Sequence, residues 1–331
     1  MKHAETFVQR MVADQVRNPG RPPVQTGHMT WNKLVRLIRF GYGQGHLEKY
    51  LPWRRVTKRD FSVHANMSHL PAPEYGHKHH PRSKAQRHLL NRLAWIGAFD
   101  VRDHYPVWPW PHEHPLEGLL GTSIDRLTRG TFEIGSECGI LPSLYPGTNL
   151  PRVITLHSLA TLVDIKWRVR LVAYQVDSTE GDESGEIPRS RELNVLRGRY
   201  CSEAGIDFRL VSERELNNQL SVNLDALRPK ATRDATARMR KSELYDYFVK
   251  ACQDEAYHTS PAHVIEAMSR NFNVQRVVFQ NAYDVARWFQ DIDTDLSLPV
   301  EPWNPLVPGG IGLRDAVRHR LFGMAEVPHV G

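Results

Sequence analysis

Residues 153–165 and 168–176 form the pattern that most restricts the possible folds of this chain. Both stretches are rich in β-branched residues, and only a short turn near Lys166 and Trp167 separates them. Such a pair of stretches predicts a long β-hairpin. A further strand pattern at residues 99–107 ends at Pro106, so we expect the hairpin to belong to one compact sheet.

Helix patterns surround these strands. Apolar residues recur at helical spacing over residues 30–40, 83–96 and 191–204, and a short helix over 131–139 ends at Gly139. A short strand is expected at 208–211. The order helix, strand, short helix, hairpin, helix and strand predicts a mixed α/β domain over residues 30–215.

The rest of the chain predicts a second domain and a terminal extension. Residues 214–240 suggest a linker or helical bridge, followed by helices at 241–253, 261–271 and 274–286. A strand at 286–291 and a Pro-rich tail from 298 follow. Three helices and a small strand pattern predict a winged-helix-like domain within residues 216–331. Residues 1–29 form an N-terminal extension that could begin with an amphipathic helix.

Composition excludes several classes of protein. The chain has 331 residues, 40% of them hydrophobic, which suffices for buried cores. It has no apolar stretch long enough for a membrane helix and no signal-peptide core at its start, so we expect a cytoplasmic, nucleoid-associated protein. Its three cysteines form no CxxC pair, which argues against a zinc ribbon or a disulfide framework.

Basic residues concentrate in one region. Residues 31–90 hold twelve Lys or Arg against three acids, interleaved with aromatic side chains. A local excess of this kind predicts a surface that contacts nucleic-acid phosphates, although a solvated basic face without a partner is the alternative. The candidates for DNA contact are Lys49, Arg54, Arg55, Lys58, Arg59, Lys78, Arg82 and Lys84.

Histidines are frequent but do not predict a metal site. The chain has 17 His, and several fall in 77–80 and 112–114. Neither spacing matches a zinc-finger pattern, and no cysteine lies nearby, so a structural zinc is not expected.

The order of motifs resembles the TnsA endonuclease family of Tns-type transposons. The resemblance begins with residues 42–45 and 50–53, continues through 83–86, 101–107 and 132–140, and includes the hairpin segments 158–164 and 173–177. Segments 192–213 and 295–306 extend it, so that it covers residues 30–310 in order. It implies a restriction-endonuclease-like core followed by a winged-helix-like domain.

The resemblance also implies a function. Members of this family cut the non-transferred DNA strand at transposon ends, with Mg²⁺ held by Glu and Asp and a Lys near the attacking water. The implied partners are double-stranded transposon-end DNA, a DDE-type transposase subunit and an AAA+ ATPase bound by the C-terminal domain.

The chain departs from the family at the catalytic positions. Gln86 stands where the resemblance implies a helix Glu, Ala160 where it implies the hairpin Asp, and Asp177 where it implies the Lys. Only Gln175 of the last motif is retained. We therefore predict weak or no nuclease activity, with Gln86 and Asp177 as weak metal ligands at most.

Two alternatives remain open at this stage. The chain could be an active Mg²⁺-dependent endonuclease with a rearranged site, or a transcription regulator that combines a winged helix with an α/β sensing domain. Trp288 and Trp303 are predicted to be exposed and to contact the protein partner, because aromatic anchors often dominate such interfaces.

Overall fold

The computed structural model describes residues 28–57, 68–119, 121–122, 124–141, 143–164, 166–177 and 189–323. The predicted N-terminal extension lies almost wholly outside these residues. The sheet of four strands has the order β3-β4-β5-β6, with antiparallel pairs except for the parallel pair β5 and β6. These strands are β3 (Asp100–Val107), β4 (Ile154–Val163), β5 (Val169–Asp177) and β6 (Asp207–Ser212). The predicted strand, hairpin and final strand of the α/β unit are confirmed.

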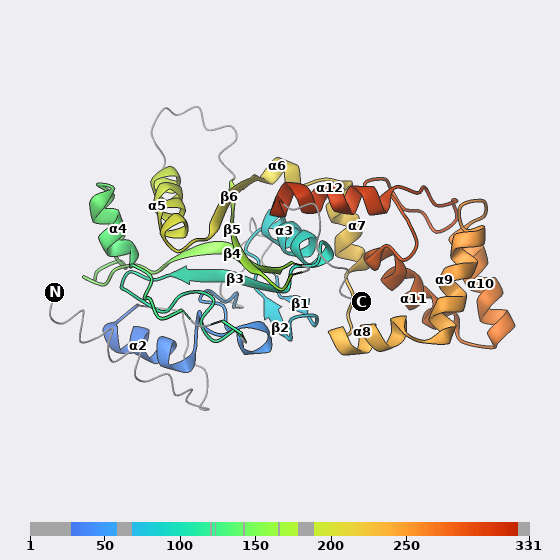
Figure 1. Ribbon diagram of the computed structural model, residues 1–331, viewed down its shortest axis with the longest axis horizontal. Helices are drawn as coiled ribbons and strands as arrows, with labels where there is room; N and C mark the ends of the chain where they lie inside the picture. Colours follow the sequence, from blue (N-terminus) through green and yellow to red (C-terminus); the bar gives the residue numbers. More distant parts are fainter. Residues whose placement is uncertain are drawn as a thin grey trace.

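Helices cover both faces of this sheet (Figure 1). Helix α3 (Lys84–Trp95) shares an apolar core with β5 on one face, and α5 (Arg189–Glu203) shares another with β4 on the opposite face. Ser83 begins α3 because its Oγ accepts a hydrogen bond from the backbone N–H of Gln86. This mixed α/β arrangement is compatible with an endonuclease-like fold.

The entry segment lies against the outer strand of the sheet. Helix α2 (Trp31–Phe40) ends at Gly41, and the short helix η1 (Leu47–Lys49) follows. Gly43 has φ +75°, and a Cβ there would lie 2.3 Å from Cγ of Pro106, so only glycine fits. Between η1 and α3, the described residues also contain a small hairpin of β1 (Leu70–Ala72) and β2 (His77–His79).

The second half of the described chain is helical. Its helices are α6 (Glu213–Leu216), α7 (Gln219–Leu227), α8 (Arg233–Arg240), α9 (Glu243–Glu255), α10 (Pro261–Phe272), α11 (Arg276–Phe289) and α12 (Gly310–Phe322), and α4 (Thr131–Glu137) lies earlier, before the hairpin. The three predicted helices correspond to α9, α10 and α11. The predicted strand at 286–291 is wrong, because α11 continues to Phe289 and buries Ala286 and Trp288. Among the described residues no strand follows β6, so the winged-helix prediction is not confirmed.

Helix α12 was not predicted, and it returns to the sheet. Figure 1 shows it running back from the C-terminal helices toward α3 and α6. Arg314 and Arg318 donate to the carbonyls of Trp95 and Ile96, and the hydroxyl of Tyr174 donates to the carbonyl of Leu321. The apolar core beside α3 therefore crosses the predicted boundary at residue 215.

The two tryptophans predicted to be exposed differ. Trp288 is only 4% exposed and packs in the core that includes α3, so its predicted exposure is wrong. Trp303 is 69% exposed, in agreement with the prediction. None of the helices in the described part of the chain is long and apolar enough to cross a membrane.

Candidate functional site

Two histidines mark a break in the sheet. The pairs Asp103–Ser158 and Tyr105–Leu156 flank His104 and His157, which do not pair, and His104 has φ +49°. Side-chain alternation changes face here: Val101 and Ala160 join the core beside α3, whereas Tyr105 and Leu156 join the core beside α5. Such irregularities in strands are frequent next to functional sites.

Beyond the end of the β4–β5 pairing, the side chain of His157 replaces a backbone carbonyl as the hydrogen-bond acceptor for β5. Pairing of β4 with β5 ends at Ser158 and Tyr174, and the N–H of Val176 then donates to Nδ1 of His157 over 3.0 Å. Since Nδ1 accepts, the proton of the neutral ring is on Nε2, 2.9 Å from the side-chain amide of Gln175. Placing the amide oxygen toward this proton gives the otherwise unpartnered Oε1 of Gln175 a donor. The retained Gln175 is thus held by a histidine.

Gln86 and Ala160 have structural environments. The side-chain oxygen of Gln86 accepts a hydrogen bond from the backbone N–H of Arg82 over 2.8 Å. This bond satisfies a backbone donor just before the N-cap of α3. Ala160 is fully buried among apolar side chains. Neither residue offers a carboxylate.

The four residues predicted to occupy the family's catalytic positions do not share one face of the sheet. Along β5, Val172 and Tyr174 belong to the core beside α3, and Leu171 and Ala173 to the core beside α5. Strand alternation therefore places Gln175 and the half-buried Asp177 on the α5 face, opposite Ala160. Of the two weak metal candidates, Gln86 is on α3, whereas the side chain of Asp177 is on the opposite, α5, face of the sheet.

Four arginines act electrostatically on one another or on the two histidines at the break in the sheet. Burial and the neighbouring charges of Arg152 and Arg82 lower the pKa of Arg54. Burial and the charge of Arg54 likewise lower the pKa of Arg197 to about 10. We call Arg54, Arg82, Arg152 and Arg197 the arginine cluster.

The two histidines at the break lie beside this cluster. Burial, with smaller effects from His104, Arg197 and Arg54, holds the pKa of His157 well below its usual range. Arg54 and Arg82 also lower the pKa of His104, after burial as the largest cause. Both rings are therefore neutral at pH 7. Within the part of the chain that the structure describes, Arg54, Arg152 and Arg197 form no ion pair with a carboxylate.

The sequence identified only half of the arginine cluster. Arg54 and Arg82 were among the predicted DNA contacts, whereas Arg152, Arg197 and His157 were not predicted. The cluster draws on loop 50–57, the start of α3, the start of β4 and α5, and no local motif links these segments.

The other predicted basic residues are scattered over the surface. Lys49, Lys78 and Lys84 are exposed, and Arg55 is half-buried with its guanidinium 3.5 Å from the hydroxyl of Tyr42. Lys58 and Arg59 lie outside the described residues. Lys49 also lines a cleft of about 870 Å³ between the entry loop, residues 108–122 and the tip of the β4–β5 hairpin.

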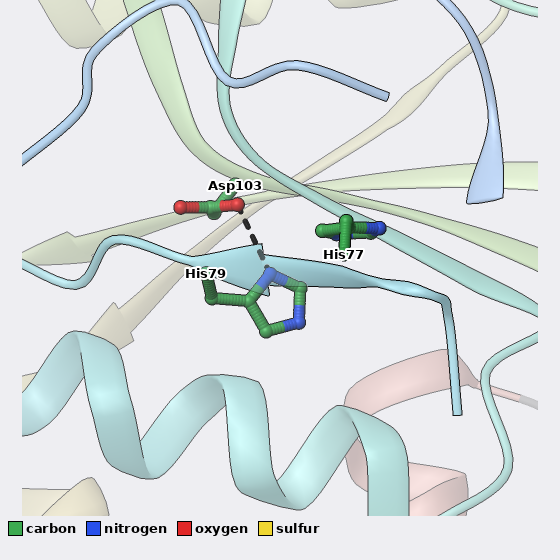
Figure 2. A group of neighbouring side chains, drawn as sticks. All are labelled: His77, His79 and Asp103. Carbon is green, nitrogen blue, oxygen red and sulfur yellow. Dashed lines mark hydrogen bonds and ion pairs between the residues drawn. The ribbon is translucent and has the colours of Figure 1, made fainter. Parts of the chain in front are cut away.

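A second polar group, not predicted from spacing, lies on β2 and β3. His77, His79 and Asp103 each offer one ligand atom, and these atoms lie within 4.8 Å of one another. Figure 2 shows His79 and Asp103 joined by a hydrogen bond, with His77 beside them. Nδ1 of His77 is 2.9 Å from the carbonyl oxygen of Leu47. These three residues could hold a metal ion, which would have to replace the bond between His79 and Asp103.

Asp103 is already satisfied by hydrogen bonds. Its carboxylate accepts from Nδ1 of His79 over 3.0 Å and from the backbone N–H of His80 over 2.7 Å. Burial by itself would raise the pKa of Asp103, but the bond and charge of His79 outweigh it and hold this pKa well below its usual range. Asp103 is therefore ionised and paired in the folded protein.

The comparisons give one relative and no family model. No protein-family model matches the chain. The chain is 21% identical over 208 residues to "Transposon Tn7 transposition protein TnsA" of Escherichia coli. This similarity indicates a distant TnsA-like relationship. The match covers 62% of this chain and 66% of the relative, so the chain spans just under two thirds of that protein.

Proposed function

We propose that the chain is a TnsA-like subunit of a DNA transposition complex that binds transposon-end DNA and partner subunits with little or no nuclease activity. The similarity to Tn7 TnsA supports the transposition role. The absence of a carboxylate at positions 86 and 160, together with Asp177 in place of the implied Lys, carries the second half of the proposal.

The chemistry of Mg²⁺ supports weak cutting. Mg²⁺ requires near-octahedral oxygen coordination, usually anchored by carboxylates together with substrate phosphate and water. Gln86 and Gln175 already have hydrogen-bond partners, and Ala160 has only a methyl group. The nearby arginine cluster would also repel a divalent cation. One carboxylate, at Asp177, remains as an anchor.

The proposed partners follow from the family resemblance. They are double-stranded DNA at the transposon ends, a DDE-type transposase subunit and an AAA+ ATPase. Lys49, Lys78 and Lys84 are exposed, and we propose them as phosphate contacts. Trp303 is the aromatic anchor that we propose for a protein partner, since it alone of the two predicted tryptophans is exposed.

A cleavage assay tests this function. The purified chain, the transposase and ATPase subunits, and labelled transposon-end duplex are incubated with Mg²⁺ or Mn²⁺. We expect binding of the duplex and no strand-specific nick. Nicking that Gln86→Ala or Asp177→Ala abolishes would instead support an active endonuclease with a rearranged Mg²⁺ site. Specific binding to a promoter duplex, without preference for transposon ends, would support the transcription regulator.

A further inference from the structure

His77, His79 and Asp103 bring three ligand atoms together from two strands. Each residue offers one such atom, and these atoms lie within 4.8 Å of one another. Nδ1 of His79 and Oδ1 of Asp103 are 3.0 Å apart. In a tetrahedral site with bonds of about 2.0 Å, neighbouring ligand atoms are about 3.3 Å apart. This pair therefore has nearly the spacing of two zinc ligands, and His77 lies beside it (Figure 2).

The hydrogen bond of His77 leaves one of its ring nitrogens without a partner. A carbonyl oxygen can only accept, so Nδ1 of His77 carries the proton that the carbonyl of Leu47 accepts over 2.9 Å. In the neutral ring, Nε2 then has a lone pair. This Nε2 atom is buried and has no hydrogen-bond partner. A buried acceptor without a donor is unfavourable, and a cation would supply the missing partner.

The outer contacts of these residues also match those of a metal site. A histidine that binds a metal usually donates its second nitrogen to a carbonyl or a carboxylate, which fixes the orientation of the ring. His77 donates to Leu47 in this way, and Oδ2 of Asp103 accepts from the backbone N–H of His80 over 2.7 Å. Both hydrogen bonds persist when Nε2 of His77 and Oδ1 of Asp103 bind an ion, because they use the other atom of each side chain.

We propose that His77, His79 and Asp103 bind one Zn²⁺ ion, with water as the fourth ligand. Two imidazoles and one carboxylate are a ligand set that Zn²⁺ accepts, whereas Mg²⁺ prefers oxygen atoms alone. The ion replaces the hydrogen bond between His79 and Asp103. The proton of the neutral His79 ring moves to its Nε2, which has no partner in the described part of the chain. His77 is half-buried and the other two residues are buried, so the ion and the water enter from the side of His77.

The ion fastens the β1–β2 hairpin to the sheet. His77 and His79 lie on β2, Asp103 lies on β3, and Leu47 belongs to η1 of the entry segment. Lys78, between the two histidines, is exposed on the other side of β2. The ion thus fixes the strand that carries one of the proposed phosphate contacts. The site itself does not depend on the function proposed above, since it contains none of the predicted catalytic positions.

Zinc binding by the full chain is the first test. The untagged chain is stripped with EDTA, dialysed, and titrated with Zn²⁺ by calorimetry. We expect one ion per chain, and His77→Gln should lower the affinity by more than about 100-fold, because loss of an outer contact alone typically costs 10–100-fold. The matched control combines His263→Gln with Cys138→Ser, two exposed residues that could bind zinc nonspecifically, and should keep the native affinity. No binding by the native chain, or equal affinity in His77→Gln, would overturn the proposal.

Co²⁺ replaces Zn²⁺ in the second test, because tetrahedral Co²⁺ absorbs visible light much more strongly than octahedral Co²⁺. The native chain should give the strong spectrum, which Zn²⁺ should abolish and excess Mg²⁺ should leave unchanged. Gln86→Ala and Asp177→Ala should keep this spectrum. A weak, octahedral spectrum would overturn the proposal, and loss of the strong spectrum in either variant would place the ion at the predicted catalytic positions instead. This readout on the native chain decides the matter even if His77→Gln does not fold in EDTA.

Discussion

Two polar groups lie near the break in the sheet, and they differ in how their charges are balanced. Around Asp103, the carboxylate accepts bonds from His79 and from the backbone of His80. In the arginine cluster, the neighbours of Arg54 are two further arginines. His104 lies between the two groups. Its Nε2 is 2.8 Å from the carbonyl oxygen of His80, and the charges of Arg54 and Arg82 lower its pKa. The Asp103 carboxylate is satisfied by hydrogen bonds within the chain, whereas Arg54, Arg152 and Arg197 pair with no carboxylate among the described residues.

This difference predicts different effects of substitution on folding. A buried charge is costly unless it is paired, and removal of one partner leaves the other exposed to the full desolvation penalty. Substitution in the Asp103 group should therefore harm folding. Substitution of Arg54 or Arg152, which pair with no described carboxylate, should relieve repulsion and leave folding nearly unchanged.

The largest effect is expected for Asp103→Asn. An amide offers one acceptor where two donors point, so the N–H of His79 or of His80 loses its partner. We expect the free energy of unfolding to fall by about 3–5 kcal/mol, measured by urea denaturation. Arg54→Gln is the control and should leave stability within about 0.5 kcal/mol. Similar losses of unfolding free energy in both variants would contradict the difference between the Asp103 group and the arginine cluster.

An intermediate effect is expected from pH. Burial lowers the pKa of His80 to about 4, and its Nδ1 accepts from the backbone N–H of Val56. Below the pKa of about 6.5 in the unfolded chain, only the unfolded state gains this proton, so stability falls as the pH decreases toward 4. The loss from pH 7 to pH 5 should be about 2 kcal/mol for this residue alone.

The matched variant for the pH effect is His80→Asn. Asparagine keeps an acceptor near the position of Nδ1 and does not titrate. Its profile of unfolding free energy between pH 7 and pH 5 should therefore be flatter than that of the native chain. His79 and His104, whose pKa values burial also lowers, leave a residual slope. An identical slope in the variant would show that His80 is not the responsible group.

The sequence predicted elements better than it predicted contacts between them. Helix α3 and the β4–β5 hairpin follow from local signals, namely the cap at Ser83 and the β-branched runs beside a short turn. The strand expected at 286–291 is wrong because tertiary packing buries Trp288 on a helix. Helix α12 was missed because Gly309, Gly310 and Gly312 follow a Pro-rich segment and disfavour a helix locally.

The candidate site could be predicted only in part. The resemblance predicts that Gln86, Ala160 and Asp177 are substituted catalytic positions, but it does not reveal that they lie on different faces. His77 and His79 reach Asp103 across 24 residues or more, which no local ligand spacing reveals. Arg54 and Arg197 come together through the tertiary fold alone.

The smallest effect is expected for Gln86→Glu, which would make the arginine cluster resemble the Asp103 group. A glutamate can keep the hydrogen bond from the backbone N–H of Arg82, and it adds a negative charge in the first turn of α3. An acid near a helix start is favourable by about 0.3–1 kcal/mol, but Gln86 is buried and a buried charge is costly, so the free energy of unfolding should change little. The same charge would partly neutralise the neighbouring arginines, so the affinity for phosphate and for duplex DNA should decrease.

No nuclease activity should appear in Gln86→Glu, because Ala160 remains a methyl group on the other face from Asp177. Calorimetry, duplex titration and the nicking assay on one preparation measure all three. A gain of strand-specific cutting in Mg²⁺ would mean that a single carboxylate was the missing part.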